Sequence, residues 1–130
     1  MDKVLIIDDE VAVCDLLKYF LALKGYEVYT ASDGYTAINK VKEVCPHLVM
    51  LDIVMPGISG MEVLKKIKKI NPKTGVIMIT AVPDQEIITE SIDLGAYDCI
   101  RKPMNLKYVE DVVRIAIKNG KRSQNAEIRK

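Results

Sequence analysis

The sequence has no long apolar run, no excess of either charge and few cysteines, and each absence narrows what the protein can be. No apolar stretch approaches the roughly 20 residues that a membrane-spanning helix needs, and acidic residues interrupt the N-terminus where a signal peptide would be apolar. The 19 basic and 18 acidic residues leave a net charge of +1, which argues against a nucleic-acid module driven by bulk positive charge. We therefore expect a soluble protein that does not enter a membrane and does not bind nucleic acid directly.

Cysteine and histidine are too few and too scattered for the usual zinc sites. Cys14, Cys45 and Cys99 form no CxxC pair, and His47 is the only histidine. Unpaired thiols suit a reducing compartment, so we expect a cytoplasmic protein. His47 precedes an apolar run, and we expect a structural or exposed role for it.

What the chain does contain is a regular alternation of apolar runs and helical patterns. Its 130 residues, 49% of them hydrophobic, are enough for one domain with a core. The first, third and fourth apolar runs are nearly all Val, Ile, Leu and Met, which is typical of parallel strands covered on both faces. The second run mixes polar and apolar residues and indicates an edge strand. The five expected strands are residues 4–8, 27–31, 48–52, 76–80 and 97–101.

Helical spacing of apolar residues fills the intervals between these runs and follows the last one. Helix stop and capping signals mark the ends, namely Gly25, Pro46, Ser59, Asp84 and Asn105. The alternation predicts an α/β fold, a doubly wound parallel sheet with right-handed crossovers. The lysines of the third helix are expected to form a solvated outer face: Lys65, Lys66, Lys68 and Lys69.

The C-terminal part of the chain leaves two interpretations open. Tyr108, Val112 and Ile115 lie off the main apolar stripe of the fifth helix, so they are either the margin of the core or a partner face. From Lys118 the chain becomes polar and basic, which indicates a frayed helix end or a linker. We expect a domain over residues 1–118 and a tail over 119–130.

Acidic residues and one lysine lie at the ends of three expected strands. Asp8 and Asp9 come at the end of the first, Asp52 ends the third, and Lys102 follows the fifth. In a doubly wound sheet, ligands bind beyond the carboxyl ends of the strands where the winding changes direction, so these groups should meet at one edge. Two carboxylates about 4 Å apart repel by roughly 4 kcal/mol at an effective dielectric near 20. A site that gathers three must therefore hold a cation or raise a pKa.

The residue types at this edge suit phosphoryl transfer with magnesium. Carboxylate oxygens are the ligands that Mg²⁺ prefers, Thr80 adds a hydroxyl at the end of the fourth strand, and Lys102 offers a charge for a phosphoryl oxygen. Asp52 is the best candidate nucleophile because it stands alone on the central strand, whereas Asp8 and Asp9 are better placed to share the cation. Singly, these residues have ordinary roles as helix caps, strand ends or surface charges, but the constellation favours a site.

The motifs at these positions resemble the receiver domain of bacterial two-component response regulators over about residues 3–118. The matching motifs, in order, are Ile7-Asp8-Asp9-Glu10, Asp52-Ile53-Val54-Met55-Pro56-Gly57 with Gly60, Thr80-Ala81, Gly95-Ala96 and Lys102-Pro103. The resemblance implies a flavodoxin-like (βα)5 fold with five parallel strands in the order 2-1-3-4-5. It also implies a phosphorylation-activated switch, in which a sensor histidine kinase phosphorylates Asp52 and the changed conformation controls a partner or output domain.

The resemblance further implies the role of each site residue. The implied magnesium ligands are Asp8, Asp9, Asp52 and the backbone carbonyl of Val54. Thr80 and Lys102 would contact the phosphoryl group, and the Lys102–Pro103 peptide would be cis. The protein would catalyse only its own phosphorylation and dephosphorylation and would not be an enzyme with a separate substrate. Receivers often pair through the fourth helix, fifth strand and fifth helix, which adds a homodimer as an alternative. The kinase, the regulated process and whether an output domain follows residue 130 stay open.

The sequence departs from the family pattern at the switch. Family members often carry Tyr or Phe three residues before the lysine, where this chain has Cys99, with Tyr97 two residues earlier. We hypothesise that signalling depends mainly on shifts of the segments after the third and fourth strands. Val54 and Val82 flank the site and cannot orient a water by hydrogen bonding, so we predict a long-lived phosphoryl group.

Three other functions fit the fold less well. An aspartyl-phosphate phosphatase typically needs a second acid two residues after the nucleophile, where Val54 stands. A flavodoxin-like module cradles phosphate after the first strand, where Asp8 and Asp9 would repel it. A scaffold that is never phosphorylated would have no use for the complete set of site residues.

Overall fold

The structure is a computed structural model that describes the backbone of residues 1–82 and 84–129 and the side chains of residues 1–82 and 84–121. Five parallel strands form one sheet in the order β2-β1-β3-β4-β5, which confirms the fold and strand order expected from the sequence. The strands are β1 Lys3–Ile7, β2 Glu27–Ala31, β3 Leu48–Asp52, β4 Gly75–Thr80 and β5 Asp98–Arg101. β3 is central, and β2 lies at an edge as predicted.

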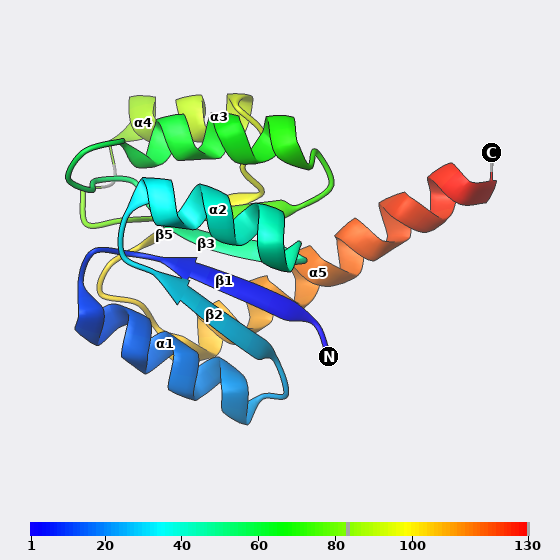
Figure 1. Ribbon diagram of the computed structural model, residues 1–130. Helices are drawn as coiled ribbons and strands as arrows, with labels where there is room; N and C mark the ends of the chain where they lie inside the picture. The colour runs from blue at the N-terminus through cyan, green and yellow to red at the C-terminus, as the bar shows by residue number, and fades with distance from the viewer. Residues whose placement is uncertain (83, 130) are drawn as a thin grey trace.

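Five helices cover the two faces of this sheet (Figure 1). They are α1 Val11–Leu23, α2 Gly34–Val44, α3 Gly60–Ile70, α4 Gln85–Asp93 and α5 Leu106–Arg129. α1 and α5 pack on one face, and α2, α3 and α4 pack on the other. Within the described residues, no helix is both long and apolar enough to span a membrane.

The apolar runs became strands because both of their faces are buried. Along β1, Val4 and Ile6 belong to the core beneath α1 and α5, while Leu5 and Ile7 belong to the core beneath α2 and α3. All four side chains are fully buried. A strand alternates its side chains between two faces, so a continuous apolar run requires a layer of helices on each side.

Local signals set most of the helix ends. Ser59, Asp84 and Asn105 accept hydrogen bonds from the first turns of α3, α4 and α5, as the capping patterns predicted. α2 ends one residue before Cys45, which adopts a left-handed conformation with φ of 51°. The following Pro46 disfavours a right-handed helical conformation at Cys45, so the helix stops there.

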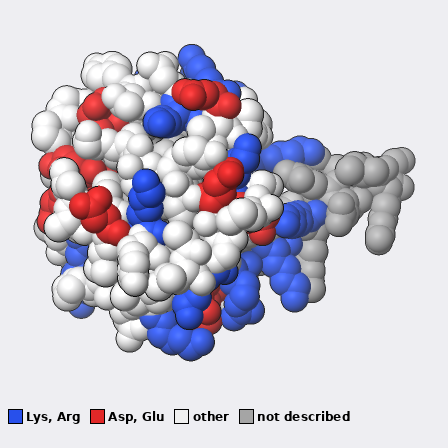
Figure 2. Space-filling view, turned by 60° about the horizontal axis from the view of Figure 1, so that its bottom comes forward, with Lys and Arg blue, Asp and Glu red and all other residues white. Residues whose placement is uncertain are grey.

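The structure shows how the C-terminal helix continues and which of its apolar side chains are buried. α5 continues to Arg129, so the segment from residue 119 extends the helix, and it projects beyond the body of the domain (Figure 1). Basic side chains gather around the base of this projection (Figure 2). Val112 is buried in the core, whereas Tyr108 and Ile115 are exposed, so the three do not form one surface.

Lys68 also departs from prediction. Lys65, Lys66 and Lys69 are exposed as expected of a solvated face, but Lys68 is half-buried. Its ammonium group donates to the backbone carbonyls of Thr74 and Pro72, at 2.8 and 3.3 Å. The long stem of a lysine can lie along the protein surface while its charge seeks acceptors, which helical spacing alone does not reveal.

Candidate functional site

The carboxyl ends of four strands, β1, β3, β4 and β5, bring the predicted site residues together. β1 pairs with β3 so that Ile7 lies opposite Leu51, and Asp8 and Asp52 each follow directly. Thr80 ends β4 opposite Arg101 of β5, and its carbonyl accepts a hydrogen bond from the Lys102 amide at 2.8 Å. Figure 2 shows acidic side chains on the side of the molecule away from the projecting helix, which is the side where the strands end. The prediction that these groups meet at one edge is confirmed.

Three carboxylates form a tight acidic cluster at this edge. Asp8, Asp9 and Asp52 each offer an oxygen, and these oxygens lie within 4.8 Å of one another. Asp8 is fully buried and Asp52 nearly so, at 5% exposed, while Asp9 is exposed at the rim. The separation matches carboxylates that share one cation.

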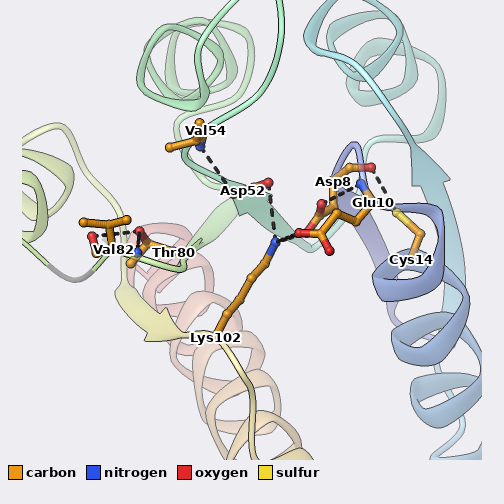
Figure 3. Close-up of polar contacts among 8 residues, drawn as sticks. All are labelled: Asp8, Glu10, Cys14, Asp52, Val54, Thr80, Val82 and Lys102. Carbon is orange, nitrogen blue, oxygen red and sulfur yellow. Dashed lines mark hydrogen bonds and ion pairs between the residues drawn. The ribbon is translucent and has the colours of Figure 1, made fainter.

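Lys102 reaches into the cluster from the loop between β5 and α5 (Figure 3). Its Nζ lies 2.8 Å from Asp8 Oδ2, 3.1 Å from Glu10 Oε1 and 3.5 Å from Asp52 Oδ2. The Lys102–Pro103 peptide is cis, as the resemblance implied. The positive charge of the Lys102 ammonium group therefore partly neutralises the negative charge of these carboxylates.

The charges in this site shift the pKa values of its members. Burial and then the charge of Asp8 raise the pKa of Asp52 to about 6, although Lys102 and the Val54 amide oppose the shift. Burial lowers the pKa of Lys102, but its close contacts with the Asp8 and Glu10 carboxylates and the charge of Asp52 outweigh burial and leave that pKa above its ordinary value. One ammonium group does not offset the crowded negative charge.

A divalent cation fits this arrangement. Asp8 Oδ2 is buried and accepts no hydrogen bond of good geometry from any described residue, so its contact with Lys102 is purely one of charge. A buried carboxylate oxygen without a hydrogen bond is costly unless a cation satisfies it. The donors are all hard oxygens, which suits Mg²⁺ better than softer metals.

Glu10 and Cys14 contact the cluster although they were not predicted as site residues. The Glu10 amide donates to Asp8 Oδ1 at 2.9 Å, and its carboxylate pairs with Lys102. The Cys14 thiol donates to the Asp8 carbonyl at 3.3 Å, and burial together with the charge of Asp8 raises the pKa of that thiol to about 11. Glu10 stands in the same acidic run and could have been included, whereas nothing in the sequence marks Cys14.

Thr80 and Val54 occupy the rim of the site. The Thr80 hydroxyl donates to the Val82 carbonyl and accepts from the Val82 amide, both at 3.0 Å, so it is engaged in its own turn (Figure 3). Among the described residues, it makes no hydrogen bond to Asp52 or Lys102. The Val54 amide donates to Asp52 Oδ1 at 3.3 Å, and Val54 as a whole is 68% exposed.

A close approach of α3 to β3 shapes the loop after Asp52. A Cβ at Gly60 would overlap the backbone of Asp52 and Ile53, so only glycine allows the helix to begin there. Gly57, in the loop between them, has a φ of +80°, which also favours glycine. Two glycines thus fix the path of the chain around the acidic cluster.

Comparison with known proteins agrees with this geometry. A family model described as the response regulator receiver domain matches residues 4–114. The sporulation initiation phosphotransferase F of Bacillus subtilis is 35% identical over 87% of this chain and 91% of that protein. A transcriptional regulatory protein of Haemophilus influenzae, a CpxR homologue, is 34% identical over 98% of this chain but only 57% of its own length.

Solved structures show the same fold. A CheY-like response regulator receiver domain protein from Methanospirillum hungatei superposes with a TM-score of 0.91 and is 28% identical, covering 95% of this chain and 98% of that one. The family match covers most of the chain, and the strand order and acidic cluster agree with it. The chain therefore belongs to the response regulator receiver domain family, whose general function is a phosphorylation switch in two-component signalling.

Proposed function

We propose that Asp52 is the phosphoacceptor of this receiver and that the phosphohistidine of a sensor histidine kinase is its donor. The convergence of Asp8, Asp52 and Lys102 at the carboxyl edge of the sheet carries this proposal. Mg²⁺ would be held by Asp8, Asp9, Asp52 and the backbone carbonyl of Val54. The bound ion would neutralise the carboxylates and the phosphoryl oxygens that they otherwise repel.

Asp52 has the position and ionisation that a nucleophile needs. With a pKa of about 6, its carboxylate is mostly ionised at neutral pH. One of its oxygens forms the new bond to phosphorus while the phosphorus–nitrogen bond of the donor breaks, and that electron pair stays on the imidazole. The Val54 amide holds Oδ1, which orients the carboxylate toward the rim.

Lys102 and Thr80 would secure the transferred group by exchanging partners. Lys102 can release Glu10, whose side chain is largely exposed, and pair with a phosphoryl oxygen. The Thr80 hydroxyl can donate to a phosphoryl oxygen only after it gives up its hydrogen bond to the Val82 carbonyl. That exchange would shift the loop after β4. This supports the hypothesis that the segments after β3 and β4 transmit the signal, with Cys99 in place of an aromatic side chain.

The remaining functional assignments are also proposals. The protein would act on no separate substrate and would work in the cytoplasm, where its effector or output domain also lies. The receiver would comprise residues 1–118, and the family match ends close to that boundary, at residue 114. Exposed Ile92, Tyr108 and Ile115 on α4 and α5 support homodimer formation through α4, β5 and α5.

A phosphorylation assay on the intact protein tests the central proposal. With Mg²⁺ and acetyl phosphate, the mass of the protein should increase by one phosphoryl group, and Asp52→Asn should abolish the increase. Asp93→Asn, which changes an exposed acid on α4, is the matched control and should be phosphorylated normally. A native protein that gains no mass, or an Asp52→Asn variant that still does, would refute the assignment.

A further inference from the structure

A groove lies at the amino ends of the strands, at the opposite edge of the sheet from Asp52. It has a volume of about 560 Å³, within the range of small-molecule sites. We call it the α3–α5 groove, and the residues that matter are Lys68, Gly75, Gly95, Tyr97, Ala116 and Asn119. It thus joins the end of α3, the starts of β4 and β5, and the part of α5 from which the projection begins.

Lys68 is held in this groove by backbone groups on both sides. Its aliphatic stem lies against Gly95, where a Cβ would come within 3.2 Å of the Lys68 Cε, and Gly95 has a φ of +105°. The ammonium group donates to the carbonyls of Pro72 and Thr74. An ammonium group has three N–H donors, and the described residues use two of them.

Within residues 1–82 and 84–121, the charge of Lys68 has no counter-ion in the groove. None of the described residues that line the groove is acidic, and none forms an ion pair with Lys68. Burial lowers the pKa of Lys68, and no carboxylate raises it in compensation. Two neutral carbonyls offset only part of the charge of this ammonium group, so an anionic ligand in the groove would supply the missing counter-charge.

Tyr97 supplies a second donor and an apolar wall. Its hydroxyl oxygen accepts a hydrogen bond from Asn119 Nδ2 at 3.0 Å, which leaves the phenolic proton for another acceptor. The ring of Tyr97 lies with Ala96 and Ala116 along the groove, and Gly75 and Gly95 contribute no side chain that would fill it. A body attached to the anionic group would therefore have both space and apolar contact.

We propose that the α3–α5 groove binds a small organic anion, a carboxylate or a phosphate monoester with an apolar or aromatic body. The anionic group accepts from Lys68 Nζ and the Tyr97 hydroxyl, and the body lies along Ala116. A ligand held there touches α5 where the helix leaves the sheet, so its binding and the position of the projecting helix are coupled. This site is separate from the acidic cluster and does not depend on phosphorylation of Asp52.

A titration followed by amide resonances in nuclear magnetic resonance tests this proposal. Phenyl phosphate, benzoate and inorganic phosphate are each added without Mg²⁺ to the full chain. Lys68→Met keeps the stem on Gly95 and removes the charge, and Lys69→Met is the matched control on the exposed face of α3. Circular dichroism establishes that both variants are folded, and Tyr97→Phe provides a second variant that leaves Lys68 in place.

The expected result is a shift of the Gly75, Gly95 and Tyr97 amides with phenyl phosphate, benzoate or both, depending on which anion the groove takes. Lys68→Met should weaken that binding by at least about tenfold, because a hydrogen bond to a charged group is lost, and Lys69→Met should not. Tyr97→Phe should weaken it by a smaller factor. The proposal is wrong if neither organic anion shifts these amides, if Lys68→Met binds like the native protein, or if only inorganic phosphate binds.

Discussion

The crowded carboxylates make a quantitative prediction about the stability of the metal-free protein. Burial and the charge of Asp8 disfavour the ionised form of Asp52 in the folded state, and its pKa therefore rises from 3.8 in an unfolded chain to about 6. A shift of this size corresponds to about 3 kcal/mol. Asp52→Asn removes the charge and keeps the shape, so it should stabilise the folded protein in the absence of divalent cations.

The sign and pH range of the effect follow from linkage. Below both pKa values Asp52 is protonated whether or not the chain is folded, so its ionisation has no effect on stability. As the pH rises through 3.8, the unfolded chain loses its proton first, and the folded state becomes less stable until the pH passes about 6. The stability gained by Asp52→Asn should therefore be larger at about pH 7.5 than at about pH 4.5, by about 2 kcal/mol.

Urea unfolding of the native protein and Asp52→Asn in a chelating buffer, at these two pH values, measures the difference. Asp93→Asn serves as the control for an exposed acid and should show no such dependence. Adding Mg²⁺ should stabilise the native protein more than Asp52→Asn, because one ligand is missing from the variant. Two results would refute the claim that crowded carboxylates destabilise the metal-free fold. One is an Asp52→Asn variant no more stable than the native protein at the higher pH, and the other is a gain in unfolding free energy that is equal at the two pH values.

Four further predictions concern single residues of the site and its surroundings. Lys102→Met should destabilise the metal-free protein by about 2 kcal/mol or more, since it leaves buried carboxylates unpaired, and Mg²⁺ should recover part of that loss in thermal unfolding. Gly60→Ala should destabilise the folded protein by about 2 kcal/mol or more and slow its phosphorylation, because the added Cβ would overlap the backbone of Asp52 and Ile53. Gly120→Ala is the control: its Cβ meets open space, so it should stabilise α5 by up to about 1 kcal/mol. Val82→Asn should shorten the lifetime of the phosphorylated protein in an acid-quenched time course, and a native phosphoprotein that already decays within seconds would contradict the lifetime hypothesis. Cys99→Tyr should leave coupling to a partner nearly unchanged in a binding titration with and without phosphorylation, and a large gain would show that an aromatic route matters.

The strands and the acidic cluster were predictable because their physical causes are local. Continuous apolar runs such as residues 48–52 can be satisfied only when both faces of a strand are covered, so the sheet and its helical layers follow from the pattern. Parallel strands all end at the same edge, so placing Asp8, Asp52 and Lys102 together needed only the order of the elements. The identity of the family then accounted for the strand order and the cis peptide at Lys102.

Side-chain partners were less predictable because they depend on which groups the fold brings near. Thr80 ends its strand as expected, but its hydroxyl is held by the backbone of Val82, two residues ahead. The Cys14 thiol reaches the Asp8 carbonyl only because α1 turns back against β1. The role of each predicted site residue in phosphorylation stays a prediction until the mass measurement is made.

The sequence by itself determined the alternation of strands and helices, the edge at which the charges gather and the chemistry that these charges permit, because residue type and spacing carry that information directly. Only the tertiary structure decided that Lys68 turns into a groove, that Val112 joins the core and that α5 continues to Arg129. Helical spacing fixes the face on which a residue lies, but the neighbours across that face come from distant parts of the chain, and they decide whether a side chain is buried, paired or free.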